Sequence, residues 1–274
     1  MNELSWLEIF IIALIQGLTE FWPVSSSGHL LLAAQWLGLN DPGQSLSVAA
    51  HLGGLIAVLI YCRRDWQGQA GSLLLLARGT SLNDVQRSHL HTFFLLVIAT
   101  LPLIPAGLVI GLLEEDGQLL LRDPLTTAST TLIFGVLLLL ALQLNRGRLF
   151  NATDLSYGHA LLIGLGQTLA LIPGTSRAGA ALTVLLLLGA APQFGARFSV
   201  LMGAPAILAA VTYEALQLDI ENALTFAVTA LASCVTALAG IGILLSVVQR
   251  IGILPFVLYR IVLGSVLLGV LLIA

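Results

Sequence analysis

Two short polar stretches interrupt apolar sequence and carry the residue types that phosphate chemistry needs. The first, GLTEFWPVSSSGHLLLAAQWLG at residues 17–38, contains Glu20, the serines Ser25, Ser26 and Ser27, and His29. The second, ALIPGTSRAG at residues 170–179, ends in a serine, an arginine and small residues. A carboxylate, hydroxyls, an imidazole and a guanidinium together can neutralise an anion and move a proton. We therefore expect the two stretches to form one anion-handling site.

Helices must position these side chains. Gln16 and Glu20 are four residues apart, which places both on one face of a first short helix. Pro23 is expected to end that helix, and the serines are expected to cap the next one, which should run to Gly38.

The second stretch predicts a similar break. Pro173 and Gly174 should interrupt a helix, Thr175 or Ser176 should cap the following one, and Arg177 should lie in its first turn. Two helix N-termini would then point at a shared cavity, and helix N-termini bind phosphate. The expected phosphate-binding residues are those beside the two caps: Ser25, Ser27, Gly174, Thr175, Ser176 and Arg177.

Each of these residues also has a simpler explanation. Serines that precede a helix are more often caps than nucleophiles. Glu20 and Arg177 could form a purely structural ion pair. A charge at the bilayer centre costs roughly 2.5 to 3.5 kcal/mol, however, and such residues usually serve function. An ion pair alone would also leave Gln16, His29 and the paired serine breaks unexplained.

The histidines and the remaining charges are expected to have different roles. His29, close to the serines, is a candidate acid or base, although a packing role is the alternative. His51 is expected to be structural in an apolar span, and Arg260 is expected to extend to the inner surface of the membrane. His89, His91 and His159 are expected at the membrane interface, and Glu214 at the outer end of a helix.

The composition places the chain in a membrane. Of 274 residues, 58% are hydrophobic and 9% are charged, and the mean hydropathy is +1.00, whereas soluble domains carry about 25% charged residues. The net charge is only −3, which does not indicate a nucleic-acid partner. Cys62 and Cys234 fall in apolar runs and are expected to be buried thiols without a disulfide. An all-α polytopic membrane protein follows.

Crossing a bilayer takes roughly 20 apolar residues in a helix. Six segments meet this length: residues 46–62, 90–112, 125–144, 197–216, 223–248 and 253–273. The interrupted regions 4–38 and 157–189 are predicted to be re-entrant pairs of short helices. The stretch 67–78 is too short to span and is predicted to be an interfacial helix.

The distribution of arginine orients these spans, because cytoplasmic loops are rich in basic residues. If the first span runs inward, the cytoplasmic arginines are Arg63, Arg64, Arg78, Arg87, Arg146, Arg148, Arg197 and Arg250, and only Arg122 lies in an outer loop. The acidic residues Asp41, Glu114, Glu115, Asp116, Asp219 and Glu221 then fall outside, as do both termini.

Internal similarity divides this single domain, residues 1–274, into two halves. The two polar stretches align with Pro23 over Pro173 and Ser26 over Ser176, and SVAAHLGGLIAV from Ser47 aligns with SVLMGAPAILAA from Ser199. Each half, about 1–145 and about 150–274, contains a re-entrant pair and three spans. Three is odd, so the halves should be inverted, as is common in transporters.

Four segments resemble a known family. QGLTEFWPVSSSGH and PGTSRAG, together with HLGGLIAV and LPFVLYR, are similar to the undecaprenyl pyrophosphate phosphatases of the bacitracin-resistance type. The resemblance covers essentially the whole chain. It implies hydrolysis of a C55 polyprenyl diphosphate at the outer, periplasmic face of the bacterial inner membrane, which recycles the lipid carrier for cell-wall synthesis.

The family motifs fall on particular residues of this chain. The Glu/Gln-x-x-x-Glu motif falls on Gln16 and Glu20, and the serine-histidine segment on Ser26 and His29. The Pro-Gly-x-Ser-Arg segment falls on Pro173, Gly174, Ser176 and Arg177. Many members have serine and threonine where this chain has Ala178 and Ala181, so two hydroxyls that would contact phosphate are missing here. A glutamate common in the family is Arg197 in this chain.

The expected mechanism is phosphoryl transfer promoted by positioning and electrostatics. Glu20, helped by the Gln16 carbonyl, is expected to hold Mg²⁺ or Ca²⁺ against the phosphates. Arg177 is expected to bind phosphate, and the nucleophile is Ser26, His29 or a water that His29 activates.

Two other classes of protein share parts of this pattern. Type-2 phosphatidic-acid phosphatases need a lysine, which the chain lacks, and a histidine where it has Thr183. A transporter or flippase of phosphorylated polyprenyl lipid remains as the alternative, because an inverted repeat is typical of transporters. The small residues of GIGILLS also suggest a helix interface and hence a homodimer.

Overall fold

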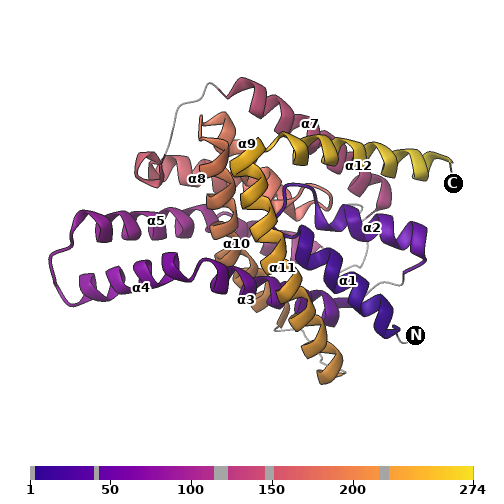
Figure 1. Ribbon diagram of the computed structural model, residues 1–274, viewed down its shortest axis with the longest axis horizontal. Coiled ribbons are helices and arrows are strands. Elements are labelled where there is room, and N and C mark those ends of the chain that lie inside the picture. Colours follow the sequence, from indigo (N-terminus) through magenta and orange to yellow (C-terminus); the bar gives the residue numbers. More distant parts are fainter. Residues whose placement is uncertain (1–3, 40–42, 114–122, 146–150, 216–221, 274) are drawn as a thin grey trace.

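The computed structural model describes residues 4–39, 43–113, 123–145, 151–215 and 222–273, and all regular elements in these ranges are helical. Figure 1 shows their arrangement. The helices are α1 (Trp6–Thr19), α2 (Ser26–Leu37), α3 (Gly43–Tyr61), α4 (Arg63–Ala77), α5 (Asp84–Thr100), α6 (Leu103–Leu113), α7 (Pro124–Leu144), α8 (Tyr157–Thr168), α9 (Arg177–Leu187), α10 (Pro192–Ala215), α11 (Ala223–Ile251) and α12 (Leu254–Ile273), with short 3₁₀ turns η2 (Ala152–Asp154) and η3 (Leu169–Leu171).

Six apolar stretches are long enough to cross a membrane, and they confirm the six predicted spans. They are residues 43–61, 84–112, 124–144, 192–215, 223–251 and 254–273. The second comprises α5 and α6, which are separated at Leu101 and Pro102. Proline cannot donate a backbone hydrogen bond to the preceding turn, so the predicted continuous helix is interrupted there. The chain is a multi-pass membrane protein.

Two pairs of short helices occupy the regions that were predicted to be broken. The first pair is α1 and α2, and the second is α8 and α9. With 14 residues, α1 is the longest of the four and reaches only about 21 Å, which is less than the hydrocarbon thickness. The helix pairs are therefore confirmed, while their re-entrant path and the inversion of the two halves stay predictions.

The two breaks share one backbone conformation. Ser25 and Ser176 have φ values of 73° and 63°, and they are the non-glycine residues with positive φ in the described part of the chain. Each caps the next helix by accepting a hydrogen bond three residues on, from the N–H of Gly28 and of Gly179 respectively. Ser176 therefore corresponds to Ser25, and the predicted alignment with Ser26 was wrong by one residue.

The first break also begins earlier than expected. α1 ends at Thr19, so Glu20 is the residue after the helix, and turns fill the chain from there to Pro23. The predicted end at Pro23 was therefore four residues late. The carboxylate consequently lies at the start of the break, where its side chain can face the other half of the protein.

Helix α11 runs through the centre of the molecule and packs against α1, α3 and α10 (Figure 1). Glycines allow the close approach: a Cβ on Gly53 would lie 2.8 Å from the Cys234 backbone nitrogen, and one on Gly240 would lie 2.6 Å from the Leu18 carbonyl oxygen. The Ser233 hydroxyl of α11 donates to the Ala50 carbonyl of α3. Gly240 belongs to the stretch that suggested a homodimer, and its contact lies within the chain, so the dimer stays a prediction.

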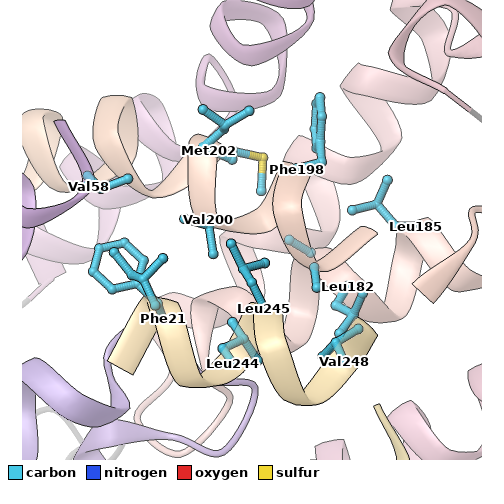
Figure 2. Packing of buried hydrophobic residues seen from close by; sticks show 14 of the residues in the cluster. Phe21, Val58, Leu182, Leu185, Phe198, Val200, Met202, Leu244, Leu245 and Val248 are labelled. Carbon is cyan, nitrogen blue, oxygen red and sulfur yellow. The ribbon is translucent and has the colours of Figure 1, made fainter. Parts of the chain in front are cut away.

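A single large apolar cluster surrounds the breaks. Figure 2 shows Phe21, from the first break, on the side of Val200 of α10 and Leu244 of α11. Phe21 is 1% exposed, and its ring lies so close to Gly203 that a Cβ there would be 2.7 Å from a ring carbon. The break is thus anchored by apolar packing on the residue directly after Glu20.

Several predictions concern the ends of the spans. α4 begins at Arg63, earlier than the predicted interfacial helix, and packs against α5. Its interfacial position stays a prediction, as does the membrane orientation inferred from arginine. Arg197 forms an ion pair with Asp65 of α4, with Nη2 2.9 Å from Oδ2. The residues Asp41, Glu114, Glu115, Asp116, Arg122, Arg146, Arg148, Asp219 and Glu221 lie outside the described residues.

Replacing Gly53 by alanine should destabilise the protein, because the new methyl group would meet the backbone of α11. Overpacking of this kind costs about 1–3 kcal/mol. A lower midpoint of thermal unfolding in detergent checks this. Gly269→Ala in α12 is the matched control, since a Cβ at Gly269 would have no atom within 4 Å. An equal effect of the two substitutions would contradict the packing argument.

Candidate phosphate-binding site

The Glu20 carboxylate is the centre of a polar cluster between the two breaks. Its Oε1 lies 2.8 Å from Nη2 of Arg177. Its Oε2 accepts from the Gln16 amide nitrogen at 2.7 Å and from the Ser26 hydroxyl at 3.3 Å. The carboxylate side chain is only 9% exposed. One carboxylate therefore gathers three groups that the sequence placed at the site.

Arg177 comes from the opposite half of the chain. It is the first residue of α9, so the break at Pro173 and Gly174 brings its side chain toward the first break. Nη1 donates to the Gly203 carbonyl of α10 at 2.8 Å. The ion pair that was considered as a structural alternative is therefore present. It is one part of a larger network, because Gln16 and Ser26 also converge on Glu20.

His51 of α3 joins this network, although the sequence suggested only a structural role. Its Nε2 lies 3.1 Å from the Gln16 amide nitrogen and 3.9 Å from Oε2 of Glu20. The sequence alignment of the two halves could have indicated a place for His51 at the site. It pairs His51 with Gly203, and both residues lie beside the Glu20–Arg177 pair.

Hydrogen bonds between the two breaks hold the serines. The Ser27 hydroxyl accepts from the Gly174 N–H at 3.0 Å and lies 3.0 Å from the Ser25 hydroxyl. The Ser176 hydroxyl donates to the Trp22 carbonyl at 3.3 Å. These hydroxyls, predicted to bind phosphate, thus have protein partners, whereas the buried Thr175 hydroxyl has none among the described residues. Their contacts with phosphate stay predictions.

Arg260 of α12 is buried directly behind the breaks, and its predicted position at the membrane surface was wrong. It is 0% exposed. Its guanidinium donates to the Thr131 carbonyl at 3.1 Å, the Pro23 carbonyl at 3.2 Å and the Gly174 carbonyl at 2.9 Å, and also to the Thr175 carbonyl. A guanidinium has five N–H donors in a planar fork, which suits several diverging carbonyls. Arg260 therefore ties both breaks to α7.

His29 lies farther along α2 and faces α12. Its Nδ1 lies 2.7 Å from the Ser25 carbonyl oxygen, and its Nε2 lies 2.8 Å from the Tyr259 hydroxyl. The two rings stack with centroids 5.5 Å apart. A carbonyl can only accept, so Nδ1 carries the hydrogen and Nε2 accepts from Tyr259. The structure places His29 beside Tyr259, a partner that the sequence did not indicate.

The two alanines at expected hydroxyl positions are buried. Ala178 is 6% exposed and Ala181 is 0% exposed. Ala178, together with Phe21, Pro23 and Ser199, borders a gap that is too small to hold a water molecule. The Ser199 hydroxyl has no hydrogen-bond partner among the described residues.

Comparison with known proteins identifies the family. The model of the family described as bacitracin resistance protein BacA matches residues 9–266. The chain belongs to the BacA family. Proteins named undecaprenyl-diphosphatase from Alcanivorax borkumensis, Chromohalobacter salexigens and Hahella chejuensis are each 40% identical to it over 270, 277 and 269 residues. Each alignment covers 97% of this chain and 98% of the relative.

In this BacA family member, Arg260→Lys should destabilise the fold. A lysine ammonium has three donors and cannot reach four carbonyls of two breaks and α7 together. Disrupting a buried charged network costs about 3–5 kcal/mol, which should appear as a large drop in the thermal midpoint. Arg250→Lys, at an exposed position, is the control and should leave the midpoint unchanged. Equal midpoints for the two variants would disprove the role of Arg260.

Ser199→Ala should leave the BacA fold at least as stable as it is now. A buried hydroxyl without a partner costs about 1–3 kcal/mol, and alanine removes it. The measurement is again the thermal midpoint, with Ser233→Ala as the comparison. The Ser233 hydroxyl donates to the Ala50 carbonyl at 2.7 Å, so its removal should lower the midpoint. A loss of stability in Ser199→Ala as large as that in Ser233→Ala would refute this.

Proposed function

We propose that the chain hydrolyses undecaprenyl diphosphate to undecaprenyl phosphate and inorganic phosphate. This recycles the lipid carrier for cell-wall synthesis and confers resistance to bacitracin. The observation that carries the proposal is the Glu20 carboxylate, which holds Arg177 from the opposite half and accepts the Ser26 hydroxyl at 3.3 Å. Family membership and relatives named undecaprenyl-diphosphatase support the substrate.

Phosphate binding uses the first turns of α2 and α9. Both helices begin at a break, and unpaired N–H groups with the positive end of the helix dipole favour a phosphate there. Arg177 pairs with Glu20 in the absence of substrate and exchanges that carboxylate for phosphate oxygens when the lipid binds. A guanidinium suits this exchange because it binds carboxylate and phosphate in the same bidentate geometry.

Ser26 is the nucleophile that the geometry favours. Its hydroxyl already donates to Glu20, so the carboxylate accepts the proton as the serine oxygen forms a bond to the terminal phosphorus. The bond from that phosphorus to the bridging oxygen breaks, and undecaprenyl phosphate leaves. Water then attacks the phosphorus of the phosphoserine, the bond to the serine oxygen breaks, and Glu20 returns its proton to that oxygen, which releases phosphate and restores Ser26. His29, or a water that it activates, is the alternative, and no hydrogen bond joins His29 to Glu20 or Ser26 among the described residues.

A divalent cation, Mg²⁺ or Ca²⁺, is proposed to accompany the diphosphate. No group of three or more His, Cys, Asp or Glu side chains suited to a metal occurs in the described part of the chain. Glu20 would supply one carboxylate, which fits Mg²⁺, an ion often held by one or two carboxylates and substrate phosphates. Gln16 turns its amide nitrogen toward Glu20, so in this arrangement the ion would rest on Glu20, and the carbonyl ligand expected from Gln16 is not part of the proposal. The ion would neutralise phosphate charge.

The proposed setting is the bacterial inner membrane, with the site open to the periplasmic face and both termini outside. The arginine distribution supports this orientation. The matching backbone conformations at Ser25 and Ser176 support two related halves, residues 1–145 and 150–274, and an inverted arrangement of re-entrant pairs. A transporter of the same lipid is the second candidate, and lipid movement in liposomes without phosphate release would favour it.

Glu20→Gln should lower kcat for phosphate release from farnesyl diphosphate by at least about 100-fold. The substitution removes the carboxylate that is both the proposed general base and the charged partner of Arg177. Ser26→Ala should do the same if serine is the nucleophile. Purified protein in detergent with Mg²⁺ or Ca²⁺ is the assay, and Arg197→Gln, which removes the ion pair with Asp65, is the control. Wild-type turnover in Glu20→Gln would exclude this mechanism.

A further inference from the structure

His51 contacts the site through the Gln16 side chain. It lies on α3, which contributes none of the residues expected to bind phosphate. Its Nε2 is 3.1 Å from the Gln16 amide nitrogen, and that nitrogen is 2.7 Å from Oε2 of Glu20. Imidazole, amide and carboxylate therefore form a continuous chain that ends on the group proposed to take the Ser26 proton.

The Ser47 carbonyl and the Glu20 carboxylate determine the direction of each hydrogen bond in this series, because both can only accept. The Nδ1 of His51 is 2.8 Å from the Ser47 carbonyl oxygen, which can only accept, so Nδ1 carries the hydrogen. The Nε2 lone pair then accepts from Gln16. The amide nitrogen of Gln16 has two hydrogens, and it gives one to His51 and the other to Glu20. Every donor meets an acceptor only in this arrangement.

Without an acceptor at position 51, the Gln16 amide would lose this constraint. Its amide nitrogen would then be held by Glu20 alone, and the Gln16 side chain could swing about that single hydrogen bond. Arg177 would still hold Oε1, but the amide that positions Oε2 beside the Ser26 hydroxyl would no longer be fixed. The orientation of the proposed base therefore depends on His51, which is not hydrogen-bonded to Glu20 and acts through Gln16.

Helix α11 packs against both α1, which carries Gln16, and α3, which carries His51. Its Thr236 hydroxyl, which is 3.0 Å from the Ala232 carbonyl of its own helix, also lies 3.2 Å from the Ala13 carbonyl of α1. Its Ser233 hydroxyl donates to the Ala50 carbonyl of α3 at 2.7 Å. Ala13 lies one turn before Gln16, and Ala50 directly precedes His51. The contact between the His51 imidazole and the Gln16 amide is thus set by the packing of α1 and α3 against α11.

We infer that His51 is a positioning residue that orients the Glu20 carboxylate by fixing the Gln16 amide. The inference rests on the proposed role of Glu20. A purely structural histidine would contribute mainly to packing, but the His51 side chain is 29% exposed and its two nitrogens are both used in directed hydrogen bonds.

Kinetics of His51→Leu test the inference with farnesyl diphosphate as the substrate. Loss of a group that orients a catalytic residue typically costs about 10-fold or more, so kcat should fall by about 10-fold while KM stays within about twofold. His51→Gln, whose carbonyl can accept from Gln16, should recover most of the loss. Leu52→Ala, the neighbouring change on α3, should lower the thermal midpoint and leave kcat unchanged.

The double variant provides the decisive comparison. If His51 acts through Gln16, then Gln16→Ala combined with His51→Leu should be no slower than Gln16→Ala alone. Multiplied losses, or wild-type kcat in His51→Leu, would overturn the inference.

A second measurement separates this inference from the proposed function. In ¹⁵N-histidine NMR, the His51 signal, assigned by its absence in His51→Leu, should be that of the neutral Nδ1–H tautomer and should shift in Gln16→Ala. Wild-type turnover in Glu20→Gln would refute the role of Glu20 alone, and the NMR result would still decide on the hydrogen bond. An Nε2–H tautomer, or a signal unaffected by Gln16→Ala, would overturn the inference about His51.

Discussion

The arrangement of this protein depends on the buried guanidinium of Arg260. A break in a helix frees backbone carbonyls, and a carbonyl buried away from water needs a hydrogen-bond donor. Arg260 donates to carbonyls of both breaks and to Thr131 of α7. No carboxylate partner for it is found in the described ranges, so carbonyl dipoles balance its charge. The same group that satisfies the freed carbonyls also brings the two breaks together.

The polar cluster in front of Arg260 divides its chemistry between the two halves. The first half contributes a carboxylate with its amide and imidazole neighbours, and the second contributes Arg177 with the Gly203 carbonyl. The two opposite charges reduce each other's cost at a site where only 9% of the carboxylate side chain is exposed. Related backbones thus carry different side chains, and the proposed cleavage of a diphosphate uses groups from both halves.

The helices and breaks were predictable because they depend on local properties. Apolar length identified the six spans, and the prolines and serines located both breaks. The errors occurred where one or two residues decide the outcome. The alignment of the repeat was off by one residue, because three consecutive serines offer three similar caps and only the positive φ of Ser25 distinguishes them. Glu20 and Arg177 were identified because a charge in an apolar segment is costly wherever it lies.

By itself, the sequence determined the class of protein, the number of spans and the two residues of opposite charge at the site, since hydropathy, proline and charge act through the membrane environment. Only the tertiary structure decided which polar groups meet. Arg260 and His51 are far from the breaks in sequence, and each looked peripheral in its own helix. Their roles arise from helix packing, because the glycines at the α11 contacts and the facing breaks set distances between side chains that no local pattern encodes.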